Sequence, residues 1–206
     1  MTAAIPARQI RAEHTDHTVT VYQAYSPGIA DAALRAGTFV APFKRERMTW
    51  IKPSFLWMAY RCGWATKPGQ ERVLAVRISR DGLAWALAHS CLSHYESELY
   101  PDHEAWSKRV HESPVRIQWD PERGLHHEAL DHRAIQIGLR GEAVDRYVDE
   151  WIVSITDVTP LTTRVADLVR GGQLAEARGA LPAEPPYPIP DELAAIIGAT
   201  PVANHA

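Results

Sequence analysis

The segment RYVDEWIVSITDVTP, residues 146–160, contains the strongest β-strand pattern of the chain, and a pair of carboxylates precedes that strand. Successive side chains of a strand point to opposite faces. The pattern therefore predicts an apolar, core-facing side formed by Trp151, Val153 and Ile155. Glu150 falls on the opposite, half-polar face, so we expect it to overlook a cleft at the end of a sheet. Asp149 is the residue before Glu150, so it alternates to the other face, and we expect it to be a surface charge.

The remaining sequence alternates irregularly between strand and helix patterns. Strand patterns lie at residues 18–25, 48–52, 71–79, 114–123 and 132–141. Helix patterns lie at residues 26–37, 53–63, 101–113, 141–150, 161–172 and 173–181. Residues 82–95 fit either state, and we expect a strand at their start. Because no strict strand–helix–strand rhythm is present, we expect an α+β fold with a mixed or antiparallel split sheet flanked by helices.

The C-terminal part of the chain differs from the rest in composition. The segment LPAEPPYPIP, residues 181–190, contains five of the 15 prolines. Such a segment is extended and unlike a folded core. We therefore expect one domain over residues 1–180 and a proline-rich extension over residues 181–206 that packs on its surface.

Composition narrows the protein class. The chain has 206 residues, a net charge of −3 and 46% hydrophobic residues, values typical of a globular domain. No apolar run approaches the roughly 20 residues that cross a membrane, and the N-terminal region lacks the pattern of a signal peptide. The two cysteines, Cys62 and Cys91, form no close pair. We expect a cytoplasmic protein without a membrane partner.

Two common kinds of functional motif are missing from the sequence. Neither GxGxxG nor GxxxxGK[ST] occurs, so a bound nucleotide would not be held by either glycine-rich loop. The ten histidines include no HExxH motif or similar ligand spacing. We therefore expect no metal site and assign these histidines to ordinary polar positions.

The segment RERMTWIKPSF, residues 45–55, is the strongest candidate for a binding site. It gathers cations, hydroxyl groups and Trp50 around a predicted junction from strand to helix. A helix N-terminus offers free N–H donors and partial positive charge, which suits phosphate. A tryptophan there can stack on a base or on nicotinamide. The alternative, equally weighted, is that Trp50 is a core residue and that the charges solvate a loop.

Gln136 interrupts an apolar run in HRAIQIGLRG, residues 132–141. A buried amide needs hydrogen-bond partners. A structural bond across the sheet is slightly favoured over contact with a ligand.

The chain resembles a bacterial and fungal family known as domain-of-unknown-function family 4291. The resemblance covers roughly residues 8–172 and is carried by MTWIKPSFLWMAYRCGWATKPGQERVLAVRI, QWDPER, RAIQIGL and DEWIVSITDVTP. This resemblance implies no specific activity.

The order of three segments also resembles the ADP-ribosyltransferase superfamily. VYQAYSP resembles the first strand of that fold, MTWIKPSF the second strand and following helix, and VDEWIVSITDV the strand that starts with a catalytic glutamate. The resemblance implies that Glu150 stabilises the oxocarbenium-like state formed when the nicotinamide–ribose bond of NAD breaks. Gln23 stands where that superfamily has His or Arg. Together with the polar positions described above, this resemblance gives the expected NAD-binding set, which is Gln23, Tyr25, Arg47, Thr49, Trp50, Lys52, Ser54, Arg61 and Gln136.

Three functions are consistent with these patterns. The first is an NAD-dependent ADP-ribosyltransferase or NAD glycohydrolase, with a nucleic acid or a protein as acceptor. The second is a nucleic-acid-binding or RNA-processing module, based on the cations and aromatic residues of residues 45–61. The third is a non-catalytic relative that binds a nucleotide in the same cleft.

Overall fold

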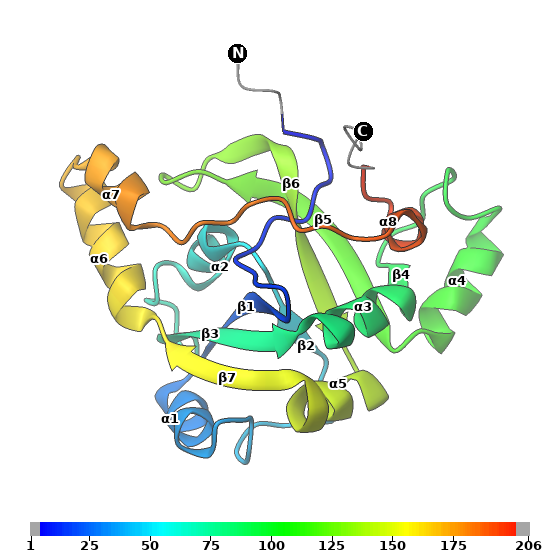
Figure 1. The fold of residues 1–206 in the computed structure, drawn as a ribbon, viewed down its shortest axis with the longest axis horizontal. Helices are drawn as coiled ribbons and strands as arrows, with labels where there is room; N and C mark the ends of the chain where they lie inside the picture. The colour runs from blue at the N-terminus through cyan, green and yellow to red at the C-terminus, as the bar shows by residue number, and fades with distance from the viewer. Residues whose placement is uncertain (1–4, 201–206) are drawn as a thin grey trace.

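Two β-sheets form the centre of the molecule (Figure 1). The structure is a computed structural model, and it describes residues 5–200 as an α+β domain. One sheet is antiparallel and has the order β1-β3-β7, with bounds Thr18–Tyr25, Arg72–Ser79 and Ile152–Asp157. The other sheet is mixed, has the order β2-β6-β5-β4, and consists of Thr49–Ile51, Ala129–Leu139, Val115–Arg123 and Ser90–Leu92. The expected fold class is confirmed.

Helices cover these sheets and both ends of the molecule (Figure 1). The helices are α1 Pro27–Ala36, α2 Phe55–Cys62, α3 Arg80–Ala88, α4 His103–Glu112, α5 Glu142–Arg146, α6 Thr159–Arg170, α7 Leu174–Ala180 and α8 Asp191–Ile197, with a π-helical turn, η1, at Tyr147–Trp151. Helix α1 packs on the β1-β3-β7 sheet, and α2 packs against β1 and β5. In the part of the chain that the structure describes, no helix combines the length and apolar character needed to cross a membrane.

Local signals account for the start and end of α2. The Ser54 hydroxyl accepts a hydrogen bond from the Trp57 N–H at 3.1 Å and so caps the helix. Gly63 ends it with φ of 59°, a left-handed conformation that glycine adopts without steric cost. The helix predicted from Pro53 to Gly63 is therefore confirmed.

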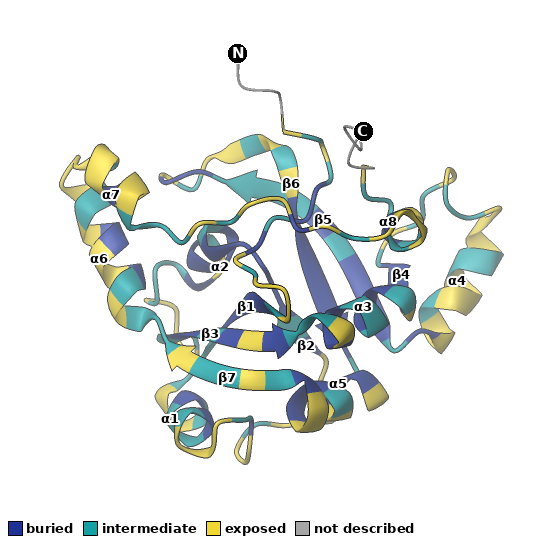
Figure 2. Ribbon diagram, in the orientation of Figure 1, coloured by how far each residue is buried: buried dark blue, intermediate teal, exposed yellow. Residues whose placement is uncertain are grey.

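The core lies between the long strands β5 and β6 and the smaller sheet (Figure 2). Ile117 and Ile137 face each other across β5 and β6 and are fully buried. Val76 and Ile78 supply the matching apolar surface from β3. Burying each such side chain contributes roughly 1.5–3 kcal/mol, and these residues of both sheets belong to one core cluster.

The strand expected at the start of residues 82–95 is wrong. Those residues continue α3 to Ala88, and only β4 at Ser90–Leu92 is extended. The Ser79 hydroxyl caps α3 by accepting from the Gly82 N–H at 3.2 Å. Leu83, Ala86 and Leu87 are buried at helical spacing. Packing of these side chains in the core therefore favours a helix, where the sequence pattern fits a strand or a helix equally well.

The strand expected to begin at Trp151 begins one residue later. Trp151 is the last residue of η1, with 4% of its surface exposed, whereas Val153 is 59% exposed. The Trp151 ring packs on α3, where a Cβ at Gly82 would lie 2.4 Å from the Trp151 Cγ. The predicted apolar face is therefore wrong for Val153, whereas Trp151 is buried and Ile155 packs on the core. Trp151 precedes the strand, and the pairing of β7 with β3 shifts register between Ile152 and Ser154, which leaves Val153 outside the alternation.

Residues 181–190 run beside the N-terminal segment across the face of the molecule (Figure 1). Ala12 N–H donates to Pro185 O at 3.1 Å, and Tyr187 N–H donates to Ile10 O at 2.8 Å. Tyr187 is buried. The last residues of the expected extension, 201–206, lie outside the described part of the chain.

Glu184 ties this segment to α2 and makes stability depend on pH. Its carboxylate accepts from the Phe55 N–H at 2.7 Å, and burial raises its pKa to about 8. A carboxyl group with a raised pKa in the folded state stabilises the fold at low pH and loses that contribution as pH rises through 8. Glu184→Gln keeps the acceptor without the charge. We expect its free energy of unfolding to exceed that of the wild type at pH 9 and to lose this advantage at pH 4.

Denaturant unfolding of both proteins across this pH range measures the difference. Glu192→Gln, at an exposed position on α8, is the control. A Glu184→Gln difference that stays constant with pH contradicts the prediction.

Candidate functional site

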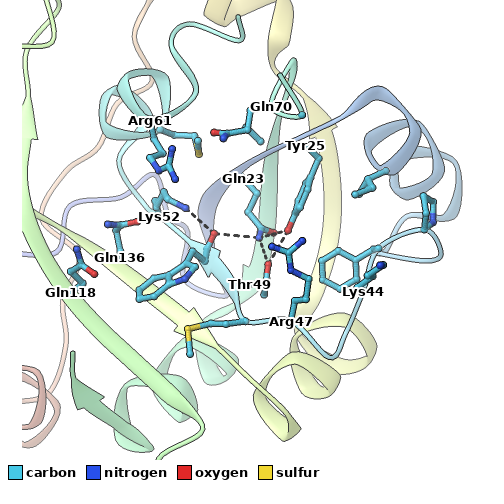
Figure 3. Close-up of a pocket in the computed structure, with 18 residues that line it drawn as sticks. Gln23, Tyr25, Lys44, Arg47, Thr49, Lys52, Arg61, Gln70, Gln118 and Gln136 are labelled. Atoms are coloured by element: carbon cyan, nitrogen blue, oxygen red, sulfur yellow. Dashed lines mark hydrogen bonds between the residues drawn. The ribbon is translucent and has the colours of Figure 1, made fainter. Parts of the chain in front are cut away.

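A pocket of about 600 Å³ lies where the two sheets diverge (Figure 3). It is lined from β1, from the chain that leads into β2, from α2, and from β5 and β6. The backbone of Lys52 links the sheets here, because Tyr22 N–H donates to Lys52 O at 2.7 Å while β2 pairs with β6. The site is therefore built partly on core strands and α2 and partly on the loop at residues 42–48.

The structure brings most of the predicted binding residues together. The lining includes Gln23, Tyr25, Arg47, Thr49, Trp50, Lys52, Arg61 and Gln136 (Figure 3). Ser54 is not among the lining residues. Its hydroxyl caps α2 and donates to Glu122 Oε1 at 2.9 Å, which is a structural role.

Glu150 also lies outside this lining. It belongs to η1 rather than to a strand, its side chain is 58% exposed, and Arg146 Nη1 lies 3.3 Å from its Oε2. The neighbouring Asp149 accepts two bonds from Arg45, at 2.6 and 2.7 Å. Both carboxylates of the pair therefore form exposed ion pairs, and the expectation that Glu150 overlooks a cleft from a strand is wrong for this pocket.

Gln23 is buried, with 2% of its surface exposed, and its amide is fully engaged within the protein. Its Oε1 accepts from the Tyr147 hydroxyl at 2.7 Å. Its Nε2 donates to the Tyr25 hydroxyl at 2.8 Å and to Thr49 Oγ1 at 2.7 Å, with Trp50 O at 3.3 Å. Gln23 thus positions the side chains that border the pocket rather than offering free groups to a ligand.

Gln136 and Gln118 are direct cross-strand partners on β6 and β5. Gln118 Nε2 donates to Asp120 Oδ1 at 3.0 Å, and Gln136 Nε2 donates to Asp120 Oδ2. An ionised carboxylate only accepts hydrogen bonds, so Asp120 fixes which end of each amide faces it. The amide oxygens are left as acceptors at the pocket wall. Gln118 is not among the binding residues expected from the sequence, although it shares the parity of Asp120 in the QWD motif, residues 118–120.

The pocket is strongly positive. Lys44, Arg47 and Arg61 line it together with Lys52. Among residues 5–200, no aspartate or glutamate belongs to the lining. Lys44 was also missed, although it directly precedes the segment singled out by its cations.

Aromatic surface borders these cations. Trp50, Phe43 and Tyr25 line the pocket, and Tyr25 packs edge-on against Phe43 with centroids 6.0 Å apart. Flat rings beside guanidinium groups suit a ligand with both a planar and an anionic part.

Lys52 stands out among the cations because it is only 6% exposed. Its Nζ donates to Trp50 O at 2.9 Å and lies 5.7 Å from the centroid of the Trp57 ring. Burial, with a smaller contribution from the nearby Arg61 charge, lowers the pKa of the Lys52 amine to about 7.

No metal centre is recognisable in the described residues, because no group of three His, Cys, Asp or Glu side chains has suitable geometry there. The side chains that line the pocket offer amine, guanidinium, amide, hydroxyl and aromatic groups. These groups suit binding of a phosphate-bearing, partly planar molecule.

Comparison with known families extends over most of the chain. Residues 9–187 match the model of a family described as "Domain of unknown function (DUF4291)". A comparison with curated proteins finds no matching relative. The description of the family names no activity, so the geometry of the pocket is the basis for assigning one.

Proposed function

We propose that the pocket binds a nucleotide, with NAD as the first candidate. The premise is that this chain belongs to the family described as "Domain of unknown function (DUF4291)". The observation that carries the proposal is the lining of the pocket. Three charged side chains, Lys44, Arg47 and Arg61, together with the Lys52 amine and several rings surround a cavity of about 600 Å³, without a carboxylate among the described lining residues. Ligand pockets for small molecules typically enclose 300–1,000 Å³.

Each part of a nucleotide has a matching surface. Arg47 and Arg61 are suited to phosphate, because guanidinium groups donate paired hydrogen bonds to its oxygens. Trp50 offers a ring face for a base or for nicotinamide. The oxygens of Gln118 and Gln136 can accept from amino groups at the edge of a base.

Removing one guanidinium group tests the phosphate contacts. Arg47→Ala and Arg61→Ala are each expected to weaken NAD binding roughly tenfold or more, since a hydrogen bond to a charged group contributes about 1.5–3 kcal/mol. Isothermal titration calorimetry with NAD, ADP-ribose and nicotinamide measures this loss. Nicotinamide, which lacks phosphate, is expected to be unaffected by either substitution.

Two variants are matched controls for this experiment. Arg35→Ala removes an exposed guanidinium from α1, and Glu150→Gln removes the exposed carboxylate from η1. Both are expected to bind NAD as the wild type does. If neither NAD nor ADP-ribose binds the wild type, the nucleotide proposal fails.

The second candidate is an NAD-dependent ADP-ribosyltransferase or NAD glycohydrolase. The observation that favours it is that Tyr25 at the end of β1 and Trp50 on β2 border the same pocket, as the resemblance to that superfamily implies. The exposed position of Glu150 argues against this residue as the catalytic carboxylate. Release of nicotinamide from NAD by the purified protein tests this candidate. Absence of release contradicts the second candidate but does not contradict nucleotide binding.

The same cations also suit a nucleic-acid ligand. RNA or DNA binding through them would weaken steeply with added salt, because phosphate contacts release counterions. Binding of single-stranded probes that exceeds binding of NAD, and that is lost in Arg47→Ala, would favour this alternative.

A further inference from the structure

Lys52 is a buried amine that faces the pocket without an ionic partner. Its Nζ donates to Trp50 O at 2.9 Å, and among the described residues it takes part in no ion pair within 4.0 Å. The Trp57 ring covers it on the side of α2. These contacts position the Lys52 side chain so that its nitrogen borders a cavity large enough for a ligand (Figure 3).

Burial is the main reason that Lys52 favours its neutral form. Arg61 and Cys62 approach from α2, and Asp120 approaches from β5. Burial has the largest effect and lowers the pKa, the Arg61 charge lowers it further, and the smaller effects of Cys62 and Asp120 oppose this shift. With a pKa of about 7, a large fraction of the amine carries a free electron pair near neutral pH.

This state suits a nucleophile better than a phosphate ligand. A lysine that binds phosphate acts through its positive charge, and burial without a carboxylate partner weakens that charge. Lysines desolvated beside another cation are instead activated for attack on carbonyl groups. Arg47 and Arg61 remain fully charged and are available for the anionic part of the ligand.

We propose that Lys52 captures the carbonyl carbon of a phosphate-bearing aldehyde as an imine. This inference rests on the proposed function for its phosphate contacts, and it names a substrate class for the same pocket. ADP-ribose belongs to that class, because its terminal ribose opens to an aldehyde while its diphosphate can bind the guanidinium groups.

The reaction is balanced without an oxidant or a reductant. The Lys52 nitrogen attacks the carbonyl carbon and forms a C–N bond while the C=O π bond breaks, and one proton passes from the nitrogen to the oxygen, which becomes a hydroxyl group. The hydroxyl then takes up the second proton of the nitrogen and leaves as water, as the C–O bond breaks and the nitrogen electron pair forms the C=N bond. Water can reverse the reaction, so capture is reversible until a reductant is added.

Trapping with pyridoxal 5′-phosphate and borohydride tests the proposal. Borohydride delivers hydride to the imine carbon and converts the linkage to a stable secondary amine, which peptide mass spectrometry locates. The chain has four lysines, Lys44, Lys52, Lys67 and Lys108. We expect labelling of Lys52 to exceed that of Lys67 and Lys108 about tenfold or more at pH 7, because the neutral amine is the reactive form.

The pH dependence of labelling gives a second readout. The yield at Lys52 is expected to rise with a midpoint near pH 7, in line with its lowered pKa. Lys52→Met and Lys52→Arg are expected to remove this label while the other lysines keep theirs. Labelling that is equal at Lys44 and Lys52, or absent at Lys52, overturns the proposal.

A matched pair of probes isolates the role of phosphate. Pyridoxal carries the same aldehyde without phosphate, and Arg47→Ala is expected to reduce labelling by pyridoxal 5′-phosphate but not by pyridoxal. Equal effects on both probes contradict the assigned phosphate contact.

Competition by NAD separates this proposal from the proposed function. Protection of Lys52 by NAD supports both. Efficient labelling of Lys52 without protection by NAD or ADP-ribose sustains the imine proposal and argues against nucleotide binding. Nucleotide binding that is measured by calorimetry, without labelling of Lys52, supports the proposed function and overturns the imine proposal.

Discussion

Lys52→Met is expected to raise the free energy of unfolding by several kcal/mol at pH 7. The folded protein keeps this amine buried and lowers its pKa from 10.5 to about 7. Each pKa unit corresponds to about 1.4 kcal/mol of preference between protonation states. Methionine has similar length and fills the same space without a charge, so it removes the cost of burying an amine that is protonated in the unfolded chain.

The direction of the Lys52 pKa shift makes the stability difference between Lys52→Met and the wild type depend on pH. Because the folded pKa is lower than the unfolded one, the unfolded chain binds more protons between pH 7 and 10.5. The stability of the wild type therefore rises with pH across that window. The advantage of Lys52→Met is expected to be greatest at pH 7 and below, and to shrink towards pH 10.5.

Chemical denaturation of the two proteins at pH 6, 7, 9 and 10 measures this difference. Lys108→Met is the control, because the Lys108 side chain is 76% exposed and remains solvated when the protein folds. A Lys52→Met protein that is less stable than the wild type at pH 7 would contradict the prediction. A stable variant also ensures that loss of imine trapping in Lys52→Met is not caused by unfolding.

Gln23→Leu is expected to destabilise the protein by about 2–4 kcal/mol, since unpaired buried polar groups cost about 1–3 kcal/mol each. The Tyr147 hydroxyl, which is buried, would lose its acceptor. The Tyr25 and Thr49 hydroxyls would lose the Gln23 donor but keep their bond to each other at 2.8 Å. Because Tyr25 and Thr49 line the pocket, nucleotide binding is expected to weaken as well.

A double-mutant cycle with Tyr147→Phe isolates the buried bond. Tyr147→Phe alone leaves Gln23 Oε1 without its donor, whereas Gln23→Leu/Tyr147→Phe removes both partners. The double variant is expected to lose less stability than the sum of the single variants. Additive losses would show that the hydrogen bond between Gln23 and Tyr147 contributes nothing of its own.

Much of the fold follows from local sequence patterns. The segment TVTVYQAYSPG predicts β1 and the start of α1, because alternation ends at Ser26 and Pro27 suits the first helical turn. Ser54 and Gly63 mark the ends of α2 in the same way. These features depend on neighbours in the chain, so the sequence contains the information needed to predict them.

The position of Glu150 shows where local reasoning fails. Alternation placed it at the start of a strand, but the chain forms the π-helical turn η1 so that Trp151 packs against α3 at Gly82. That contact joins positions 82 and 151, which are distant in the chain, so alternation within residues 146–160 carries no signal of it. A carboxylate expected at a cleft is consequently an exposed partner of Arg146.

The amino-acid sequence shows that residues 45–61 combine cations with aromatic rings, and its local patterns predict that a strand and a helix meet there. Contacts between distant segments establish which of those residues share a cavity, and they set the chemical state of those residues. Of the residues predicted for the site, Ser54 and Glu150 lie outside the pocket and Lys52 is buried beside it, while Gln118 of β5 is an additional lining residue. The reason is physical: residue identity sets the intrinsic pKa and hydrogen-bonding groups, whereas burial and neighbouring charges come from segments distant in the chain.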